Sequence, residues 1–298
     1  MSLPTVSIGF PVYNGEKYLK KALDSLLGQD YKDFEIIISD NASTDKTPDI
    51  CREYAKKDSR IRYYYNESNY GAMWNYRKVF MLARGKYFKW AAHDDECYPS
   101  MLRRCVETLD KNPTSVLGVY PLCEIINEYN QVVGSPPDHV DSQAKRPYRR
   151  LARVLFRVSF AHSFYGLFRT EFLHKMLGYR HIASDHLLLA EISMWGEIWE
   201  IPELLFRLRL HPENAMEINK TRSSMEAWFD PRRRNRWPMV PYQLVIMLEH
   251  LKSVRHTPLS PLNKIFCYIT VLTVPPWRTF LRNAGRQRDR LRGMLNMS

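Results

Sequence analysis

The sequence predicts an α/β fold with a mostly parallel sheet, because strand-like and helical segments alternate along its first hundred residues. A strand is expected at residues 5–10, and residues 16–27 follow it with leucines at helical spacing. Residues 34–38 are continuously apolar, which is typical of a strand that is buried on both faces. Such a sheet is covered by helices on both sides and holds its ligands at the carboxyl ends of its strands.

The alternation continues beyond these segments. Hydroxyl and acidic side chains at residues 44–47 favour the start of a helix that ends near residue 57. The further strands are expected at residues 61–65, 86–92, 116–120 and 163–169, with a strand or hairpin at 197–210. The further helices are expected at residues 73–84, 100–111, 149–158 and 185–195, and a loop is expected around residues 134–137.

Composition limits the class of protein. The chain has 298 residues, of which 45% are hydrophobic, and this is enough for a large core. Its five cysteines are scattered and form no C-x-x-C pair, so neither a zinc site nor a disulfide framework is indicated. The first residues lead directly into a strand pattern and do not resemble a signal peptide. Reduced thiols and a cytoplasmic location are therefore expected.

Positive charge is concentrated at the end of the chain. Residues 1–214 contain 29 Lys and Arg against 27 Asp and Glu, whereas residues 215–298 contain 15 against 5. Beyond His211 the pattern also becomes interrupted by prolines and rich in arginine. The sequence therefore predicts a nearly neutral catalytic domain at 1–214 and a basic, mainly helical appendage at 215–298.

A cluster of acids follows the strand expected at residues 86–92. Asp94 and Asp95 would lie at the carboxyl end of this strand, where two adjacent carboxylates repel each other unless a cation or a proton intervenes. A divalent metal that carries a phosphorylated ligand explains the pair, because Mg²⁺ and Mn²⁺ prefer hard oxygen ligands. The alternative is a solvated loop whose acids cap the helix after Pro99.

Polar side chains also follow the other early strands. Residues 11–16, 39–45 and 69–75 each connect the end of a strand to the start of a helix, where backbone N–H groups and carboxylates can hold a base or ribose. The same residues could be ordinary turn and cap residues. Neither a G-x-G-x-x-G nor a G-x-x-x-x-G-K-[ST] motif is present, which disfavours dinucleotide and P-loop sites.

Five blocks in this order resemble the inverting family-2 glycosyltransferases, which have the GT-A fold and use nucleotide sugars. The blocks cover about residues 4–214 and read V-S-I-G-F-P-V-Y-N, I-I-I-S-D-N-A-S-T-D, N-Y-G-A-M-W-N, G-K-Y-F-K-W-A-A-H-D-D-E-C-Y-P and A-S-D-H-L-L-L-A-E-I, the last followed by R-L-R-L-H-P-E-N-A. The resemblance implies a Rossmann-like nucleotide-sugar half at about 1–115 and an acceptor half at about 116–214. The implied donor-nucleotide contacts are Pro11, Tyr13, Asn14, Glu16, Asp40, Asn41, Ser43, Asn69, Gly71, Asn75, Asp94 and Arg209.

The resemblance also implies a metal site and a base. Asp95 would be the direct ligand of Mn²⁺ or Mg²⁺, His211 a second ligand, and Asp94 either a ligand or a ribose contact. Ala92 stands where the commonest form of the motif has its first acid, which puts the role of Asp94 in doubt. Asp185 matches the general base, preceded by Ser184 instead of the usual acid, although it could equally cap the helix that follows. Residues 162–166 lie where the family builds its acceptor floor.

The basic region carries aromatic residues and one apolar run, at residues 265–274, which is too short to span a membrane. Arginine and tryptophan around a short apolar segment suit an anionic membrane surface. Packing of this run on the body or on a second copy of the chain is the alternative. No nucleic-acid-binding motif accompanies the charge, so nucleic acid is not an expected partner.

Together these features predict an inverting, metal-dependent glycosyltransferase of the hexosyltransferase class. Its expected donor is a UDP-sugar, and its expected acceptor is a carbohydrate or lipid-linked hydroxyl in surface polysaccharide or glycolipid synthesis at the inner face of the cell membrane. Two alternatives remain, namely a nucleotidyltransferase of similar fold and a degenerate nucleotide-sugar-binding or scaffold protein. The first would need a basic, glycine-rich phosphate loop near the N-terminus, and residues 10–14 do not supply one.

Overall fold

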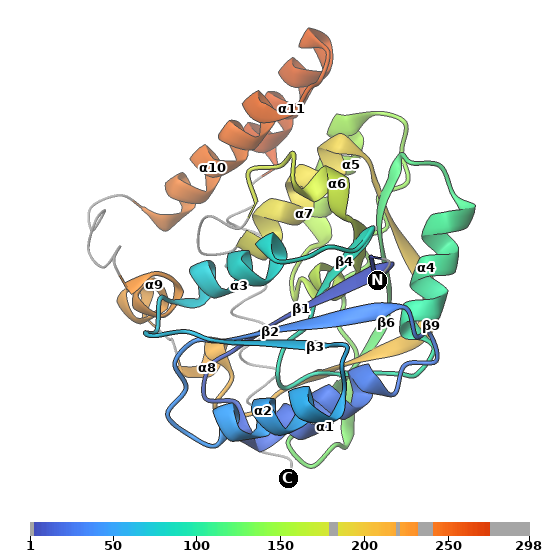
Figure 1. Ribbon diagram of the computed structural model, residues 1–298. Coiled ribbons are helices and arrows are strands. Elements are labelled where there is room, and N and C mark those ends of the chain that lie inside the picture. The colour runs from blue at the N-terminus through green and yellow to red at the C-terminus, as the bar shows by residue number, and fades with distance from the viewer. Residues whose placement is uncertain (1–2, 179–183, 219–220, 232–240, 275–298) are drawn as a thin grey trace.

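A single nine-stranded sheet runs through the computed structural model, which describes residues 3–178, 184–218, 221–231 and 241–274 (Figure 1). The strand order is β3-β2-β1-β4-β8-β6-β9-β5, and β7 pairs with β6. The strands are β1 (Val6–Val12), β2 (Phe34–Asp40), β3 (Ile61–Tyr65), β4 (Tyr87–Trp90), β5 (Glu96–Cys97), β6 (Val116–Ile126), β7 (Val132–Gly134), β8 (Leu167–Arg169) and β9 (Glu197–Arg209).

Helices connect these strands and cover the sheet on both faces (Figure 1). They are α1 (Glu16–Leu27), α2 (Thr47–Lys57), α3 (Ala72–Met81), α4 (Met101–Lys111), α5 (Pro147–Arg157), the 3₁₀ helix η1 (His162–Tyr165), α6 (Thr170–Leu173), α7 (Ser184–Trp195), α8 (Ala215–Ile218), α9 (Arg222–Phe229), α10 (Tyr242–His256) and α11 (Pro261–Thr273).

The predicted α/β class is confirmed, and the first four strands have the expected parallel arrangement. β1 pairs in parallel with both β2 and β4, and β2 pairs in parallel with β3. The last pair of the β1–β2 register is Val12 with Asp40, so the loops after both strands begin side by side. The other half of the sheet is mixed, because β8 runs antiparallel to β4 and β6 whereas β9 runs parallel to β6.

Two segments differ from the sequence-based expectation. The strand expected at residues 163–169 is a 3₁₀ turn followed by the three-residue strand β8. The segment 197–210 forms the single long strand β9 and no hairpin. Both segments are rich in large apolar residues, which do not distinguish a short turn from a strand by periodicity alone.

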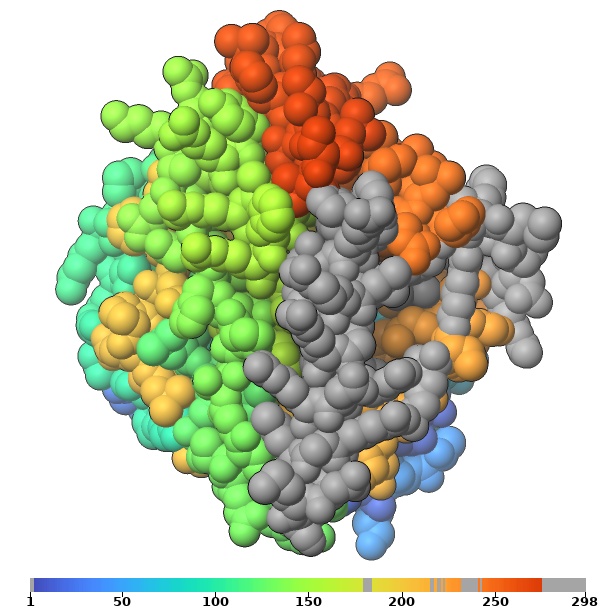
Figure 2. Space-filling model, turned by 180° about the vertical axis from the view of Figure 1, so that it is seen from behind, coloured from blue at the N-terminus to red at the C-terminus, as the bar shows by residue number. Residues whose placement is uncertain are grey.

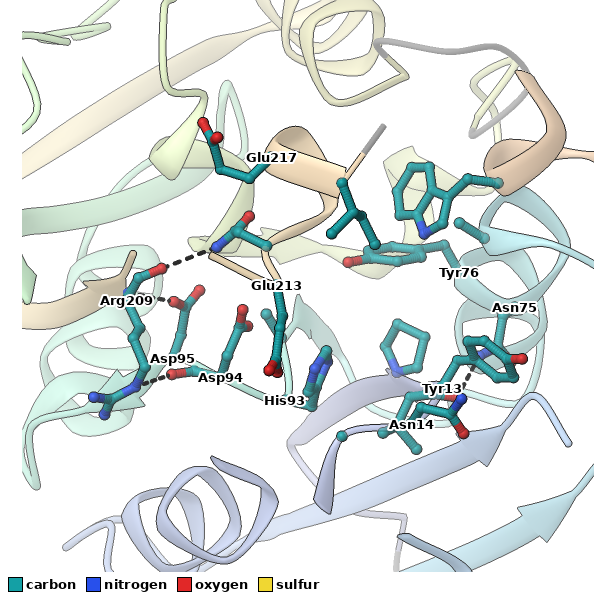
Figure 3. Close-up of a pocket in the computed structure, with 18 of the residues that line it drawn as sticks. Tyr13, Asn14, Asn75, Tyr76, His93, Asp94, Asp95, Arg209, Glu213 and Glu217 are labelled. Atoms are coloured by element: carbon teal, nitrogen blue, oxygen red, sulfur yellow. Dashed lines mark hydrogen bonds between the residues drawn. The ribbon is translucent and has the colours of Figure 1, made fainter. Parts of the chain in front are cut away.

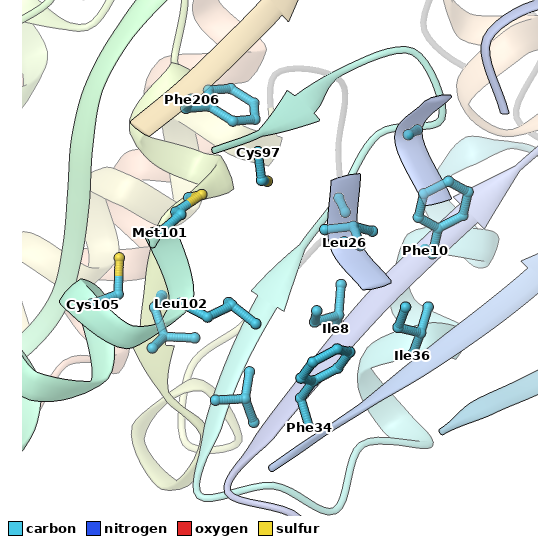
Figure 4. Packing of buried hydrophobic residues seen from close by; sticks show 14 of the residues in the cluster. Ile8, Phe10, Leu26, Phe34, Ile36, Cys97, Met101, Leu102, Cys105 and Phe206 are labelled. Carbon is cyan, nitrogen blue, oxygen red and sulfur yellow. The ribbon is translucent and has the colours of Figure 1, made fainter. Parts of the chain in front are cut away.

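Two hydrophobic clusters lie on opposite faces of the sheet. One packs α1 and α4 against β1 and β2, and Figure 4 shows Leu26 beside Ile8, with Met101 of α4 on the side of Cys97. The other packs α3, α5 and α7 against the opposite face through residues such as Phe88. Side chains that alternate along the strands supply both clusters, as a sheet covered on both faces requires.

Helices α10 and α11 lie at one end of the molecule, as the orange and red atoms in Figure 2 show. α11 packs on α5 and α10, and it buries Cys267, Thr270 and Val271 against the body. For the apolar run at residues 265–274, the sequence predicted either binding to a membrane surface or packing on the body or on a second copy. The buried residues of α11 pack on the body. Within the described residues, no helix combines the length and apolar character needed to cross a membrane. The basic segments at residues 232–237 and 278–292 lie outside the described residues.

Candidate active site

A cavity of about 910 Å³ opens at the carboxyl ends of β1 and β4. The loops after these strands, the first turns of α1, α3 and α7, and the end of β9 line it together with α8 and α9. The predicted sites therefore share one cavity. Figure 3 shows Tyr13, Asn14 and Asn75 on one side of it and Asp94 and Asp95 on the other.

Most of the predicted donor-site residues line this cavity, but four of them do not. Those that line it are Pro11, Tyr13, Asn14, Asn41, Asn69, Asn75, Asp94 and Arg209. In the described part of the chain, the residues that line the cavity do not include Glu16, Asp40, Ser43 or Gly71. Direct contact of any of these residues with a nucleotide stays a prediction.

Three of the four instead join the loops that shape the wall. Asp40 is fully buried, and its two carboxylate oxygens accept hydrogen bonds from the N–H of Ser43 and the hydroxyl of Tyr63, each at 2.9 Å. Ser43 Oγ accepts the N–H of Asn14, and Glu16 accepts the N–H of Lys46. Ser43 and Glu16 thus connect the β1–α1 loop to the β2–α2 loop, and Asp40 fixes Ser43.

A network of asparagines fixes one side of the cavity. The side-chain amide of Asn75 donates to the carbonyls of Ser39 and Val12, at 2.9 and 3.3 Å. The amide of Asn41 donates to Asn69 at 2.7 Å. Because these bonds hold the ends of β1 and β2 and the residue 69 loop together, this wall is preorganised for a ligand.

The acidic pair lies opposite this network. Asp94 Oδ2 is 3.0 Å from Nε2 of His211, and Asp95 Oδ1 accepts the backbone N–H of Arg209 at 2.9 Å. Burial opposes ionisation of Asp94, but His93 and His211 outweigh it and lower the pKa of this carboxyl. Burial and the charge of Asp94 raise the pKa of Asp95 well above its usual value. Without a cation, Asp95 therefore tends to hold a proton, as expected for adjacent carboxylates.

The donor set suits a divalent cation. Two carboxylates and an imidazole converge here, and the second oxygen of Asp95 has no hydrogen-bond partner in the described part of the chain. Across that same part, however, no group of three or more His, Cys, Asp or Glu side chains is placed so that the group could hold a metal ion by itself. Mn²⁺ or Mg²⁺ would therefore take its remaining ligands from phosphate oxygens and water, as these ions commonly do.

The guanidinium of Arg209 is bonded to protein and not free for phosphate. It is fully buried, and it donates to the carbonyl oxygens of Asp94 and Asn127 at 2.9 and 3.0 Å, to Asn130 and to Glu96. These bonds fix the acidic loop on the end of β9. The predicted phosphate contact of Arg209 would require several of them to break.

Asp185 lies in the first turn of α7 and faces the same cavity. Its Oδ1 accepts a hydrogen bond from the backbone N–H of His186, at 2.8 Å. The same oxygen lies 3.0 Å from Nδ1 of the His186 imidazole. Burial opposes ionisation, but the charge and hydrogen bonds of His186 prevail and lower the pKa of Asp185. An ionised carboxylate is the form that can accept a proton.

Other cavity residues were expected only in part or not at all. Phe164 and Tyr165 line the cavity, whereas His162 is buried against Tyr120, and a role of this segment as the acceptor floor stays a prediction. Tyr76 was missed, although its position next to Asn75 at the start of α3 could have revealed it. Burial raises the pKa of Tyr76, and the charges of Asp94, Asp95 and Asp185 raise it further.

Residues beyond the expected domain boundary at 214 also line the cavity. They include Glu217 of α8 and Trp228 of α9. Gly71 has a φ of +86°, and a Cβ there would lie 2.6 Å from the carbonyl oxygen of Phe229. The end of α9 thus packs directly on the residue 71 turn. The division at residue 214 remains a proposal, and the cavity contains residues from both sides of it.

Known proteins resemble this chain in sequence. The profile of the family described as Glycosyl transferase family 2 matches residues 7–177. An uncharacterized glycosyltransferase of Rickettsia typhi is 40% identical over 126 residues, which are 42% of this chain and 38% of that protein. An uncharacterized glycosyltransferase of Haemophilus influenzae is 28% identical over 222 residues, and this match covers 72% of this chain and 68% of that protein. The match therefore spans about two fifths of the Rickettsia relative's length.

Solved structures share the fold. TarS of S. aureus, in complex with UDP, is 18% identical with a TM-score of 0.57, and the match covers 91% of this chain and 90% of that one. The mannosyltransferase PcManGT of Pyrobaculum calidifontis, in complex with GDP-Man and Mn²⁺, is 19% identical with a TM-score of 0.56, covering 96% and 74%. At these identities the likeness shows the GT-A architecture alone. Because the family profile matches more than half of its residues, the chain belongs to glycosyl transferase family 2.

Proposed function

We propose that this protein is a metal-dependent, inverting glycosyltransferase that transfers a sugar from a UDP-sugar to a hydroxyl acceptor. The observation that carries the proposal is the presence, in one cavity, of the Asp94–Asp95–His211 cluster and the ionised Asp185. The cluster suits a cation on the donor diphosphate, and Asp185 suits a base for the acceptor.

In the proposed reaction, Asp185 and the Asp94–Asp95 pair have different roles. Asp185 takes the proton of the acceptor hydroxyl as that oxygen attacks the anomeric carbon from the face opposite the leaving diphosphate, which inverts the configuration. Asp94, Asp95 and His211 would hold Mn²⁺ or Mg²⁺, and the bound ion would supply Lewis-acid stabilisation of the leaving phosphate. Tyr13 and the asparagine network contact the nucleoside.

The structural neighbours help to choose donors for a test. Their titles name UDP, UDP-GlcNAc, and GDP-Man with Mn²⁺. A screen of UDP- and GDP-sugars with Mn²⁺ is expected to find release of a nucleoside diphosphate from a UDP-sugar, and chelation by EDTA should abolish it. Release of pyrophosphate would instead favour the nucleotidyltransferase alternative. Thermal stabilisation by donors without release of any product would favour a binding protein.

We further propose that the C-terminal region binds an anionic membrane surface, where a carbohydrate or lipid-linked acceptor for surface polysaccharide or glycolipid would be found. One face of α11 is apolar and exposed, and its side chains are between 40% and 61% accessible: Leu262, Ile265, Phe266, Ile269 and Leu272. Their spacing places them on a single stripe, and such stripes are typical of interfacial helices. The ten excess positive charges of residues 215–298 would add electrostatic attraction.

The full chain is therefore expected to sediment with anionic liposomes at low salt and less so at physiological salt, where exposed charges are screened within about 8 Å. Ile269→Ser should weaken this binding, because it removes an apolar contact from the exposed stripe. Leu204→Ser is the matched control, since Leu204 is similarly exposed on β9. If liposome binding is absent but the chain dimerises through α11, the stripe is an interface between two copies.

A further inference from the structure

Asp185 belongs to a row of three titratable side chains, since it contacts His186 directly and the charge of Asp138 acts on His186. Its Oδ1 is fixed by two contacts to His186, 2.8 Å from the backbone nitrogen and 3.0 Å from Nδ1 of the ring. Its Oδ2 has no hydrogen-bond partner among the residues that the structure describes. One oxygen of the carboxylate is therefore anchored to protein, and the other remains available to a ligand in the cavity.

The third member of the row is Asp138, which is 1% exposed and follows β7. Its Oδ2 accepts the backbone N–H groups of Ser159, Phe160 and Ala161, at 2.8, 2.7 and 3.0 Å. Ala161 adopts a left-handed conformation, with a φ of +54°. Because Ser159 and Phe160 line the cavity beside His186, Asp138 fixes a turn of the cavity wall next to the base.

The direction of the His186 pKa shift agrees with the contact between His186 and Asp185. Burial would lower the pKa of His186, but Asp185 and Asp138 outweigh it and raise that pKa. Burial lowers the pKa of His162 in η1 to about 4, so that ring is neutral. The guanidinium of Arg150 is bonded to the carbonyl oxygens of residues 193 and 194, at the far end of α7. The elements packed against α7 carry further charged or titratable side chains. They are Arg149, Arg153 and Arg157 of α5, Glu124 of β6, Glu249, His250, Lys252, Arg255 and His256 of α10, and Glu197, Glu200, Glu203, Arg207 and Arg209 of β9.

We propose that His186 is a positioning residue for the catalytic base. Its ring and backbone N–H hold Oδ1 of Asp185, so that Oδ2 faces the acceptor hydroxyl, and Asp138 fixes the ring's environment and the 159–161 turn. The acceptor proton passes to Oδ2 of Asp185, and His186 keeps its own proton throughout. This inference rests on the proposed glycosyl transfer, in which Asp185 is the base.

The first test measures the row without any substrate. In the full chain labelled with ¹⁵N-histidine, His186→Gln identifies the resonance of this ring. We expect His186 to titrate above the ordinary value of about 6.5, and Asp185→Asn and Asp138→Asn each to lower its pKa by about one unit. An ordinary or lower pKa in the unaltered protein, or one that both substitutions leave unchanged, would overturn the proposal.

The second test separates positioning from folding and from donor binding. His186→Gln should lower kcat about tenfold, a fraction of the usual effect of a general base, whereas His186→Leu should lower it further because leucine cannot donate to Asp185. UDP affinity with Mn²⁺ and the melting temperature should stay close to those of the unaltered protein, and His256→Gln on α10 is the control. Equal kcat in all variants would contradict the inference.

The two tests also distinguish this inference from the proposed function. If UDP with Mn²⁺ does not bind to the unaltered protein and no sugar is transferred, the proposed function fails. The histidine titration then still decides whether the Asp185–His186–Asp138 row exists. If transfer occurs but the titration shows no coupling, the inference fails and the proposed function stands.

Discussion

Asp185→Asn is expected to lower kcat by about 100- to 10,000-fold, the usual contribution of a general base, while donor binding stays nearly unchanged. The amide has the same size as the carboxylate, and its oxygen can still accept the backbone N–H of His186, which now lies 2.8 Å from Oδ1. It cannot take up the acceptor's proton at neutral pH. Steady-state transfer rates and calorimetry with UDP and Mn²⁺ measure the two effects separately.

Asp49→Asn is a suitable control for this substitution, because the side chain of Asp49 is 82% exposed on α2. Near-normal turnover in folded Asp185→Asn would show that another group is the base. The next candidates for the base would then be Glu213 and Glu217, because these two glutamates also line the cavity. Glu191, on the same helix as Asp185, is fully buried and accepts the backbone N–H of Leu177. A loss of folding in the variant would instead indicate that Asp185 mainly stabilises the first turn of α7.

The sequence predicted the early part of the fold well, because periodicity and the order of motifs both report it. Residues 16–27 form α1 with the expected bounds, and residues 61–65 form β3. The parallel pairing of β1, β2 and β4 then brings the ends of these strands to one edge, as the pattern indicated. The mixed half of the sheet could not be predicted, since the direction of β8 depends on long-range packing and not on its three residues.

The sequence predicted which loops form the cavity, but it did not predict the hydrogen bonds of their side chains. Asp40 and Arg209 are buried and bonded to protein, and their contact with the nucleotide stays a prediction. A sequence motif shows that a residue type is present at a strand end, and it does not show which way the side chain turns. Trp228 was missed for a different reason, because α9 reaches the cavity from a region that composition assigned to a separate basic appendage.

Removal of the cation is the other change with a large expected effect. Without Mn²⁺ or Mg²⁺, the diphosphate of UDP would face Asp94 and Asp95 across the cavity with no positive charge between them, so chelation should weaken UDP binding by at least about tenfold. Asp95→Asn should produce a similar loss even with Mn²⁺ present, because the amide is a poorer ligand. Calorimetry of UDP with and without Mn²⁺ measures both effects.

The same substitution is expected to have the opposite effect on the metal-free protein. Asp95 is 8% exposed, and burial together with the charge of Asp94 raises its pKa, so at neutral pH the folded protein must either bury this charge or take up a proton, and both cost stability. Asparagine is neutral without binding a proton, and its side-chain oxygen can still accept the N–H of Arg209, as Oδ1 of Asp95 does at 2.9 Å. Asp95→Asn should therefore raise the melting temperature in EDTA but abolish the further rise caused by Mn²⁺ and UDP. Asp110→Asn on α4 is the control. If UDP binds equally well after chelation and in Asp95→Asn, the acidic pair does not hold a metal, and the role of Asp95 is limited to fixing the end of β9.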